Sequence, residues 1–194
     1  SVVPTINFSP GTLTQFTAAP APVTLSPGSS TTFIWSFSPS ATGTYSLTAY
    51  AAGPDAISGL TQTSASYSGQ AIVRSPAVLT SSISLSPANA STSQLVTLIM
   101  TVTNSGEADA ISVAPIQSNG STYLAKVGTA NPVVLSTGPT PGSQTVPGLS
   151  TRAFTFVYQA NGAGVLAFSG ASRGTDAILG AEIESGPGPS NNIN

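Results

Sequence analysis

Few side chains in this sequence could do chemistry. Its 194 residues include no histidine and no cysteine, and of its ten charged residues six are acidic. The commonest general base and every thiol nucleophile are therefore missing, as are disulfides and thiolate metal sites. No serine lies three residues before Lys126, the single lysine, and no GxSxG, P-loop or GxGxxG motif occurs. The residues predict a protein that is not an enzyme and uses no cofactor.

Four of the acids stand where they could hold calcium. Asp55 and Asp176 occupy equivalent places in GPDAI and GTDAI, and Glu107 and Asp109 follow a turn at residues 104–106. Calcium prefers carboxylates together with backbone carbonyls, so these residues are weak candidates for calcium ligands. The alternative that we favour is that each carboxylate accepts backbone N–H bonds and holds its turn. Glycosidase chemistry needs two carboxylates across a cleft, which acids in turns do not suggest.

Glycosylation is a further candidate modification. Asn7, Asn89 and Asn119 each begin an Asn-x-Ser sequon, so all three are candidate sites if the protein is displayed on a surface. Glu182 and Glu184 have the spacing of one strand face, and we expect both to face water.

The elements that must position these residues are strands. In TTFIWSF at residues 31–37 the aromatic residues fall at every second position, the period of a strand with one buried face, and FTFVY at 154–158 repeats the pattern. We therefore assign the aromatics of residues 31–37 to a core strand rather than to a sugar-stacking platform. Better candidates for exposed aromatic residues are Tyr45, Tyr50 and Tyr67.

The distribution of proline and glycine along the whole chain is typical of a β protein. Sixteen prolines and nineteen glycines interrupt it every few residues, and helical patterns are almost absent. Residues 94–103 are apolar and β-branched on both faces, which is typical of a central strand. Short strands separated by turns predict an all-β fold.

An internal repeat divides the sequence. With a shift of 121 residues, residues 29–60 align with residues 150–181, and eight of these 32 positions are identical. The shared elements are an aromatic strand, a glycine turn, a second strand and the GxDAI turn. Upstream, SVVP at 1–4 resembles SVAP at 112–115. We therefore expect two modules, residues 1–75 and 76–194.

The two copies are not equally complete. Ahead of SVAP the second copy holds two predicted strands, at 79–86 and 94–103, for which the first copy has no counterpart. The first module should therefore be an incomplete sandwich that exposes backbone donors and an apolar groove. We expect a segment from outside this sequence, or a strand of another subunit, to fill the groove. Residues 183–194 contain no obvious closing strand.

Three motifs carry a family resemblance: VTLIMTVTNSGEADA at 96–110, FTF at 154–156 and GTDA at 174–177. This pattern resembles the CARDB-like and other immunoglobulin-like tandem repeats of large bacterial and archaeal surface proteins. The resemblance covers residues 76–194 and, as a partial copy, residues 1–75. It implies two immunoglobulin-like β-sandwich modules in tandem, the first lacking its N-terminal strands, used as a spacer, stalk or adhesive segment outside the cell.

Net charge and hydropathy limit the kinds of partner that the chain could bind. A net charge of −2 with four scattered cations argues against nucleic acid as a partner. The sequence contains no run of about 20 apolar residues, so it predicts no membrane-spanning helix. Because one lysine protects few strand edges, we expect those edges to be paired in an assembly, covered by sugar or kept apart by tethering in a longer polymer. The sequence predicts a structural subunit of an extracellular filament or cell-surface stalk, joined by β-strand complementation to copies of itself or to adjacent repeats. The alternative is a carbohydrate-binding or adhesin module that recognises surface glycans.

Overall fold

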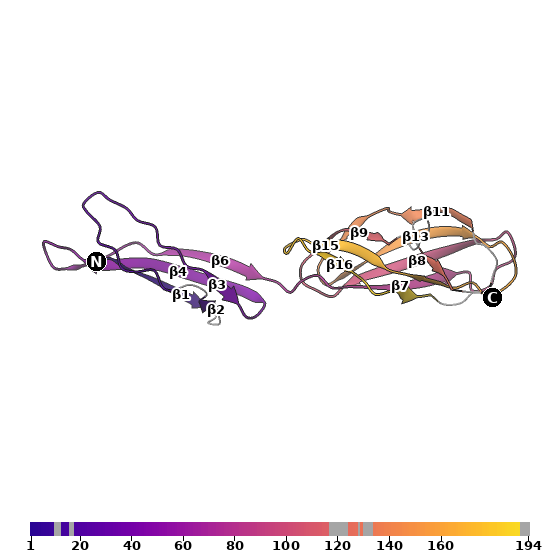
Figure 1. Ribbon diagram of the computed structural model, residues 1–194, viewed down its shortest axis with the longest axis horizontal. Coiled ribbons are helices and arrows are strands. Elements are labelled where there is room, and N and C mark those ends of the chain that lie inside the picture. Colours follow the sequence, from indigo (N-terminus) through magenta and orange to yellow (C-terminus); the bar gives the residue numbers. More distant parts are fainter. Residues whose placement is uncertain (10–12, 16–17, 117–123, 128, 130–133, 191–194) are drawn as a thin grey trace. The chain divides into compact units, whose positions relative to one another are not determined.

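The computed structural model describes all residues except 10–12, 16–17, 117–123, 128, 130–133 and 191–194. The chain divides into two compact units, which we call unit 1 (Ser1–Arg74) and unit 2 (Ser75–Asn194). The boundary lies one residue from the expected one. The described residues form antiparallel sheets and no helix, as the sequence predicts (Figure 1). They therefore include no helix that could cross a membrane.

Unit 2 contains two four-stranded sheets. The first has the order β11-β13-β8-β7 and the second the order β12-β9-β15-β16, and a smaller sheet has the order β10-β14-β17. The strands of the first sheet are β7 (Leu79–Ser86), β8 (Leu95–Asn104), β11 (Val134–Thr140) and β13 (Ser150–Gln159). Those of the second are β9 (Ala110–Pro115), β12 (Gln144–Val146), β15 (Ser172–Asp176) and β16 (Glu182–Glu184). Those of the third are β10 (Ala125–Lys126), β14 (Phe168–Gly170) and β17 (Gly188–Pro189).

One hydrophobic core lies between the sheets of unit 2. Its centre is β8, where four alternate side chains are fully buried: Val96, Leu98, Met100 and Val102. On the neighbouring strand β13, Phe154 and Phe156 are equally buried. The second sheet contributes Val113 and Val146. Alternation along each strand therefore sends one set of side chains into a shared core, the arrangement that a two-sheet protein needs.

The ends of unit 2 meet along β7. This strand pairs antiparallel with β8 over eight positions. On its other side Ile83 forms a parallel bridge with Ser190, just after β17. The first and last strands of the unit are therefore parallel neighbours.

Unit 1 is built around one long central strand. β4 pairs with β1 along one edge and with β5 and β6 along the other. A separate two-stranded sheet joins β2 to β3. The bounds of these strands are β1 (Val3–Ser9), β2 (Leu13–Gln15), β3 (Phe37–Pro39), β4 (Gly43–Pro54), β5 (Thr61–Thr63) and β6 (Tyr67–Val73).

Strand register shows that the two units repeat one architecture. Pro4 pairs with Ala51 in unit 1, and their aligned counterparts Pro115 and Ser172 pair in unit 2. The bridge between Val2 and Val23 likewise matches the pairing of Val113 with Gln144. The pairs between β4 and the start of β6 match those between β14 and β17. Since register follows from hydrogen bonds, the match is independent of the sequence identities.

Two strands of unit 2 have no counterpart among the described residues of unit 1: β7 and β8. The consequence appears in residues 29–36, which align with the first eight residues of β13. They form no strand, although the alternation of residues 31–37 predicts one; only Phe37 enters a strand, β3. In unit 2 β13 pairs with β8 over its full length, and no strand among the described residues of unit 1 corresponds to β8.

Candidate functional site

The candidate site is one face of the unit 1 sheet, which we call the open face. Residues directly opposite each other in a sheet point to the same side, and on β4 the odd-numbered residues share their side with even-numbered residues of β1. That side is apolar, whereas the opposite side of β4 carries hydroxyl side chains such as Thr44, Ser46 and Thr48. The apolar side chains of the open face are Pro4, Ile6, Phe8, Tyr45, Leu47, Ala49, Ala51, Ala71 and Val73.

The open face is poorly covered. Tyr45, at 3% exposed, is the one buried apolar side chain among the described residues of unit 1. Phe33, Trp35 and Phe37 reach toward this side and remain partly exposed, and the ring of Phe37 lies 4.4 Å from that of Phe8 between centroids. Their counterparts in unit 2, on β13, lie beside β8 and are buried in the core. The described residues of unit 1 therefore leave most of this face without the cover that its counterpart has in unit 2.

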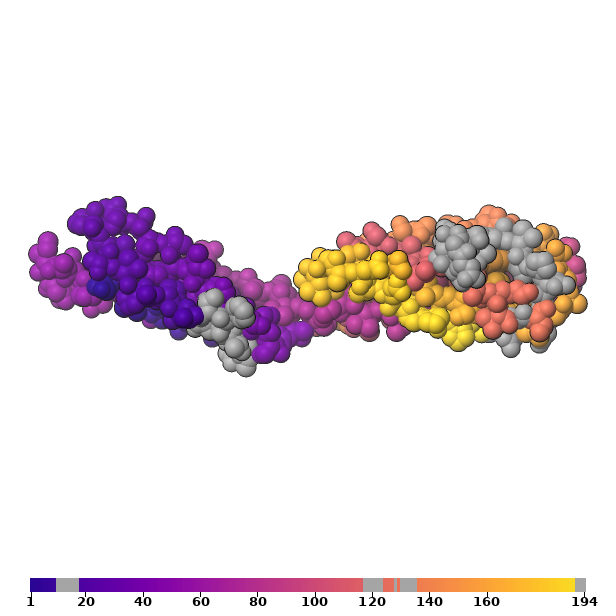
Figure 2. Space-filling model, viewed as in Figure 1, coloured from indigo at the N-terminus to yellow at the C-terminus, as the bar shows by residue number. Residues whose placement is uncertain are grey.

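A hollow of about 880 Å³ lies at one end of the open face. The segment from residue 18 to 36 forms a lobe beside the turn between β4 and β5 (Figure 2), and residues of both line the hollow. Four of its lining residues are Phe33, Ala51, Asp55 and Ser64.

In unit 2 the counterparts of these residues contact β7 or the residues just before it. The backbone N–H of Ala77 donates to Oδ2 of Asp176 at 2.7 Å. The hydroxyl of Ser81 lies 3.0 Å from that of Ser172 and 2.6 Å from that of Ser185. The space that is hollow in unit 1 is therefore filled in unit 2 by the entry of β7.

Asp176 holds both its own turn and β7. Its Oδ1 accepts hydrogen bonds from the backbone N–H groups of Ile178 and Leu179, at 2.8 and 2.7 Å. Bonds from Leu179 and from Ala77 lower the pKa of this buried carboxyl group below its usual value. These contacts are those of the turn-holding alternative, and Gly180, at φ 67°, closes the turn.

Asp55 holds the equivalent turn in unit 1. Its Oδ1 accepts hydrogen bonds from the N–H groups of Ile57 and Ser58 and from the Ser58 hydroxyl, at 3.0, 2.7 and 3.0 Å. These bonds, first that of the Ser58 N–H, lower the pKa of Asp55. Among the described residues nothing donates to Oδ2, the atom that in Asp176 receives the N–H of Ala77.

The other two calcium candidates hold different loops. Glu107 accepts the N–H of Ser75 at 3.0 Å, and Asp109 accepts the N–H of Gly148 at 2.9 Å. No group of three acidic side chains that could hold a metal ion occurs in the described part of the chain. The four acids therefore lie in three separate turns or loops, with Glu107 and Asp109 both in the connection between β8 and β9.

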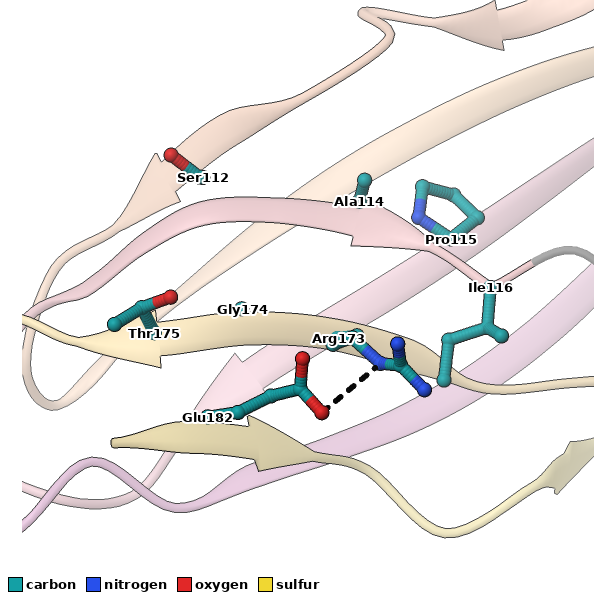
Figure 3. A pocket seen from close by; sticks show the side chains of 8 residues that line it. All are labelled: Ser112, Ala114, Pro115, Ile116, Arg173, Gly174, Thr175 and Glu182. Carbon is teal, nitrogen blue, oxygen red and sulfur yellow. Dashed lines mark ion pairs between the residues drawn. The ribbon is translucent and has the colours of Figure 1, made fainter. Parts of the chain in front are cut away.

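Sequence reasoning missed an ion-pair cluster on the outer side of the second sheet of unit 2. Arg173 on β15 pairs with Glu184 and lies 3.6 Å from Glu182, so a cation separates the two acids that we expected only to face water. They border a shallow depression of about 540 Å³ (Figure 3). The depression is lined by Ser112, Ala114, Pro115, Ile116, Arg173, Gly174, Thr175 and Glu182. All three charged side chains are about half exposed, so the pairs contribute little to stability.

The remaining candidates are scattered. Asn7 on β1 and Asn89 in the turn after β7 are both exposed, and Asn119 lies outside the described residues. The expectation of an exposed Tyr45 is wrong, because this side chain is buried and its hydroxyl donates to the carbonyl of Ala41 at 2.9 Å. Tyr67 is 77% exposed. Tyr50 is partly buried.

Comparison with family models, with curated proteins and with solved structures finds no match for this chain.

Proposed function

We propose that the protein is a non-enzymatic structural subunit of an extracellular filament or cell-surface stalk. In this proposal each unit is an immunoglobulin-like sandwich, and unit 1 is completed by β-strand complementation between protomers or neighbouring repeats. The observation that carries the proposal is the open face of unit 1, whose counterpart in unit 2 is covered by β7 and β8. An uncovered apolar face beside a segment that forms no strand is a template for strand addition.

Two further features support a structural role. Eight of the charged side chains in a chain of 194 residues lie in turns, loops or one cross-strand ion-pair cluster rather than in a shared cleft. A contact that joins two different surfaces head to tail relates each subunit to the next by a rotation. Where that rotation does not close a ring, the contacts continue into an open filament. A repeat that accepts strands on one unit has the asymmetry that such a contact requires.

The purified chain tests this proposal. We expect reversible association into linear oligomers as its concentration rises at neutral pH, seen by sedimentation velocity and electron microscopy. Leu47→Lys places a charge on the open face and should abolish association, whereas Thr48→Lys, on the opposite face of the same strand, should leave it intact. Monomers at every concentration, with residues 29–36 as protected from hydrogen exchange as β13, would contradict the proposal.

A further inference from the structure

We propose that the open face of unit 1 binds a two-stranded β-hairpin with the side-chain pattern of β7 and β8, carried by a neighbouring repeat of the same kind. The inference rests on the proposed function, for which it names the strand donor. Unit 2 serves as the template, because the two units share the registers of their remaining strands. What covers a face in one unit therefore indicates the chemistry that fits the same face in the other.

The central strand of the hairpin must be apolar at every second position. In unit 2 the buried side chains of β13 lie opposite Met100, Leu98 and Val96 of β8. The aligned residues of unit 1 are Phe33, Trp35 and Phe37. A strand in the same register would pair with residues 29–36 and would place its apolar side chains beside these three aromatic residues.

A polar contact would fix the position of the hairpin. In unit 2 one oxygen of Asp176 holds its turn and the other receives the N–H of Ala77, two residues before β7. In unit 1 Asp55 holds the same turn with one oxygen and lines the hollow, and among the described residues nothing donates to its second oxygen. The hairpin would deliver an N–H group to that oxygen.

Equivalent serines in the two units also lie where β7 packs in unit 2. Ser185 bonds the backbone of Ser172 in both directions, at 2.8 Å each, and also meets Ser81 of β7. Ser64 bonds the backbone of Ala51 in the same way, at 2.8 and 3.0 Å. The polar groups that receive β7 in unit 2 are thus already in position in unit 1.

One position differs between template and site. Gly188 on β17 lies so close to the backbone of β7 that a Cβ there would overlap the carbonyl of Ser81. Its counterpart in unit 1 is Tyr67, whose side chain is 77% exposed. The hairpin must therefore pass farther from β6 at this point than β7 passes from β17, and Tyr67→Gly should tighten its binding.

Register also specifies the experiment. β8 leads through a short turn into β9, and residue 112 of unit 2 aligns with residue 1 of unit 1. A second copy of residues 77–111 fused directly before Ser1 of the full chain would therefore enter the open face without a linker. We expect amide exchange in residues 29–36 to slow by about a hundredfold or more, as for a formed ladder. The emission of Trp35, the single tryptophan, should shift to the blue.

Two versions of the added hairpin separate docking from mere attachment. Leu98→Lys in the added copy changes a side chain that would face the aromatics and should abolish the protection. Ile99→Lys changes an outward side chain, 39% exposed in unit 2, and should leave the protection intact. Equal protection by both versions, or protection by neither, would overturn the proposal.

A synthetic peptide of residues 77–111, added to the unmodified chain, decides the matter if the fusion does not fold. As the peptide is added, the emission of Trp35 should shift to the blue and saturate. Asp55→Asn keeps the oxygen that holds the turn but loses the second acceptor oxygen, so it should weaken peptide binding by about three- to tenfold. No emission change would refute the proposal. Docking of the hairpin to a chain that never self-associates would uphold this inference while refuting assembly between copies.

Discussion

Truncation of two aligned phenylalanines measures how unequal the units are. Phe154 on β13 is fully buried in the core of unit 2, whereas Phe33 occupies the equivalent place in unit 1 and is only partly buried. Truncating a fully buried phenylalanine removes its transfer free energy and leaves a cavity, so Phe154→Ala should lower the free energy of unfolding of unit 2 by about 3–5 kcal/mol. Phe33→Ala leaves no closed cavity, and its cost should be about 1–2 kcal/mol.

Hydrogen exchange in increasing urea measures both effects in the full chain. Amides of β8 report on unit 2 and amides of β4 report on unit 1, so each unit serves as the internal control for the other. A loss of 3–5 kcal/mol corresponds to a change of roughly 10²- to 4 × 10³-fold in the unfolding equilibrium. Equal losses in the two units would show that unit 1 has a core as complete as that of unit 2, and the reasoning for an open face would fail.

Three further predictions concern unit 2. The pKa of Asp176 is lowered, so the contribution of this carboxyl group to stability is present above the usual value of 3.8 and is lost as the pH falls through the native pKa. Asp176→Asn should therefore flatten the dependence of the melting temperature on pH below about 4. Burial raises the pKa of Tyr158 from 10.0 to about 12, so the contribution of its neutral hydroxyl to stability is complete below pH 10 and is lost as the pH rises toward 12. When the ionisation of the tyrosines is followed by absorbance, the Tyr158→Phe variant should lack the last step. Gly106→Ala would place a Cβ on the carbonyl of Pro76 and should cost about 1–3 kcal/mol in urea denaturation, whereas Gly142→Ala, which meets nothing within 4 Å, should cost far less.

The sequence predicted most of the architecture, because alternation and repeats are local signals. Strands at Leu79–Ser86 and Leu95–Asn104 lie within one residue of the predicted ranges. Eight identities were enough to align the two units, and their hydrogen-bond registers agree with that alignment. The closing strand β17 was missed because it has only two residues.

Other features depend on contacts that no local pattern encodes. Alternation in residues 31–37 shows which side chains would face a core, but a strand also needs a neighbouring strand, and residues 29–36 form no strand in the structure. The bond from Ala77 to Asp176 joins residues 99 positions apart. Arg173 meets Glu184 only through the register of β15 with β16. Such contacts become visible once the sheets are assembled.

The parallel bridge between β7 and the residue after β17 bears on how unit 2 would carry tension. A pull on the first and last strands of the unit would slide these neighbours along each other rather than peel them apart. In that geometry the backbone bonds on both sides of β7, eight paired positions with β8 among them, would share the load and would have to rupture together. A chain of such units, each loaded in shear, would extend little before it gave way.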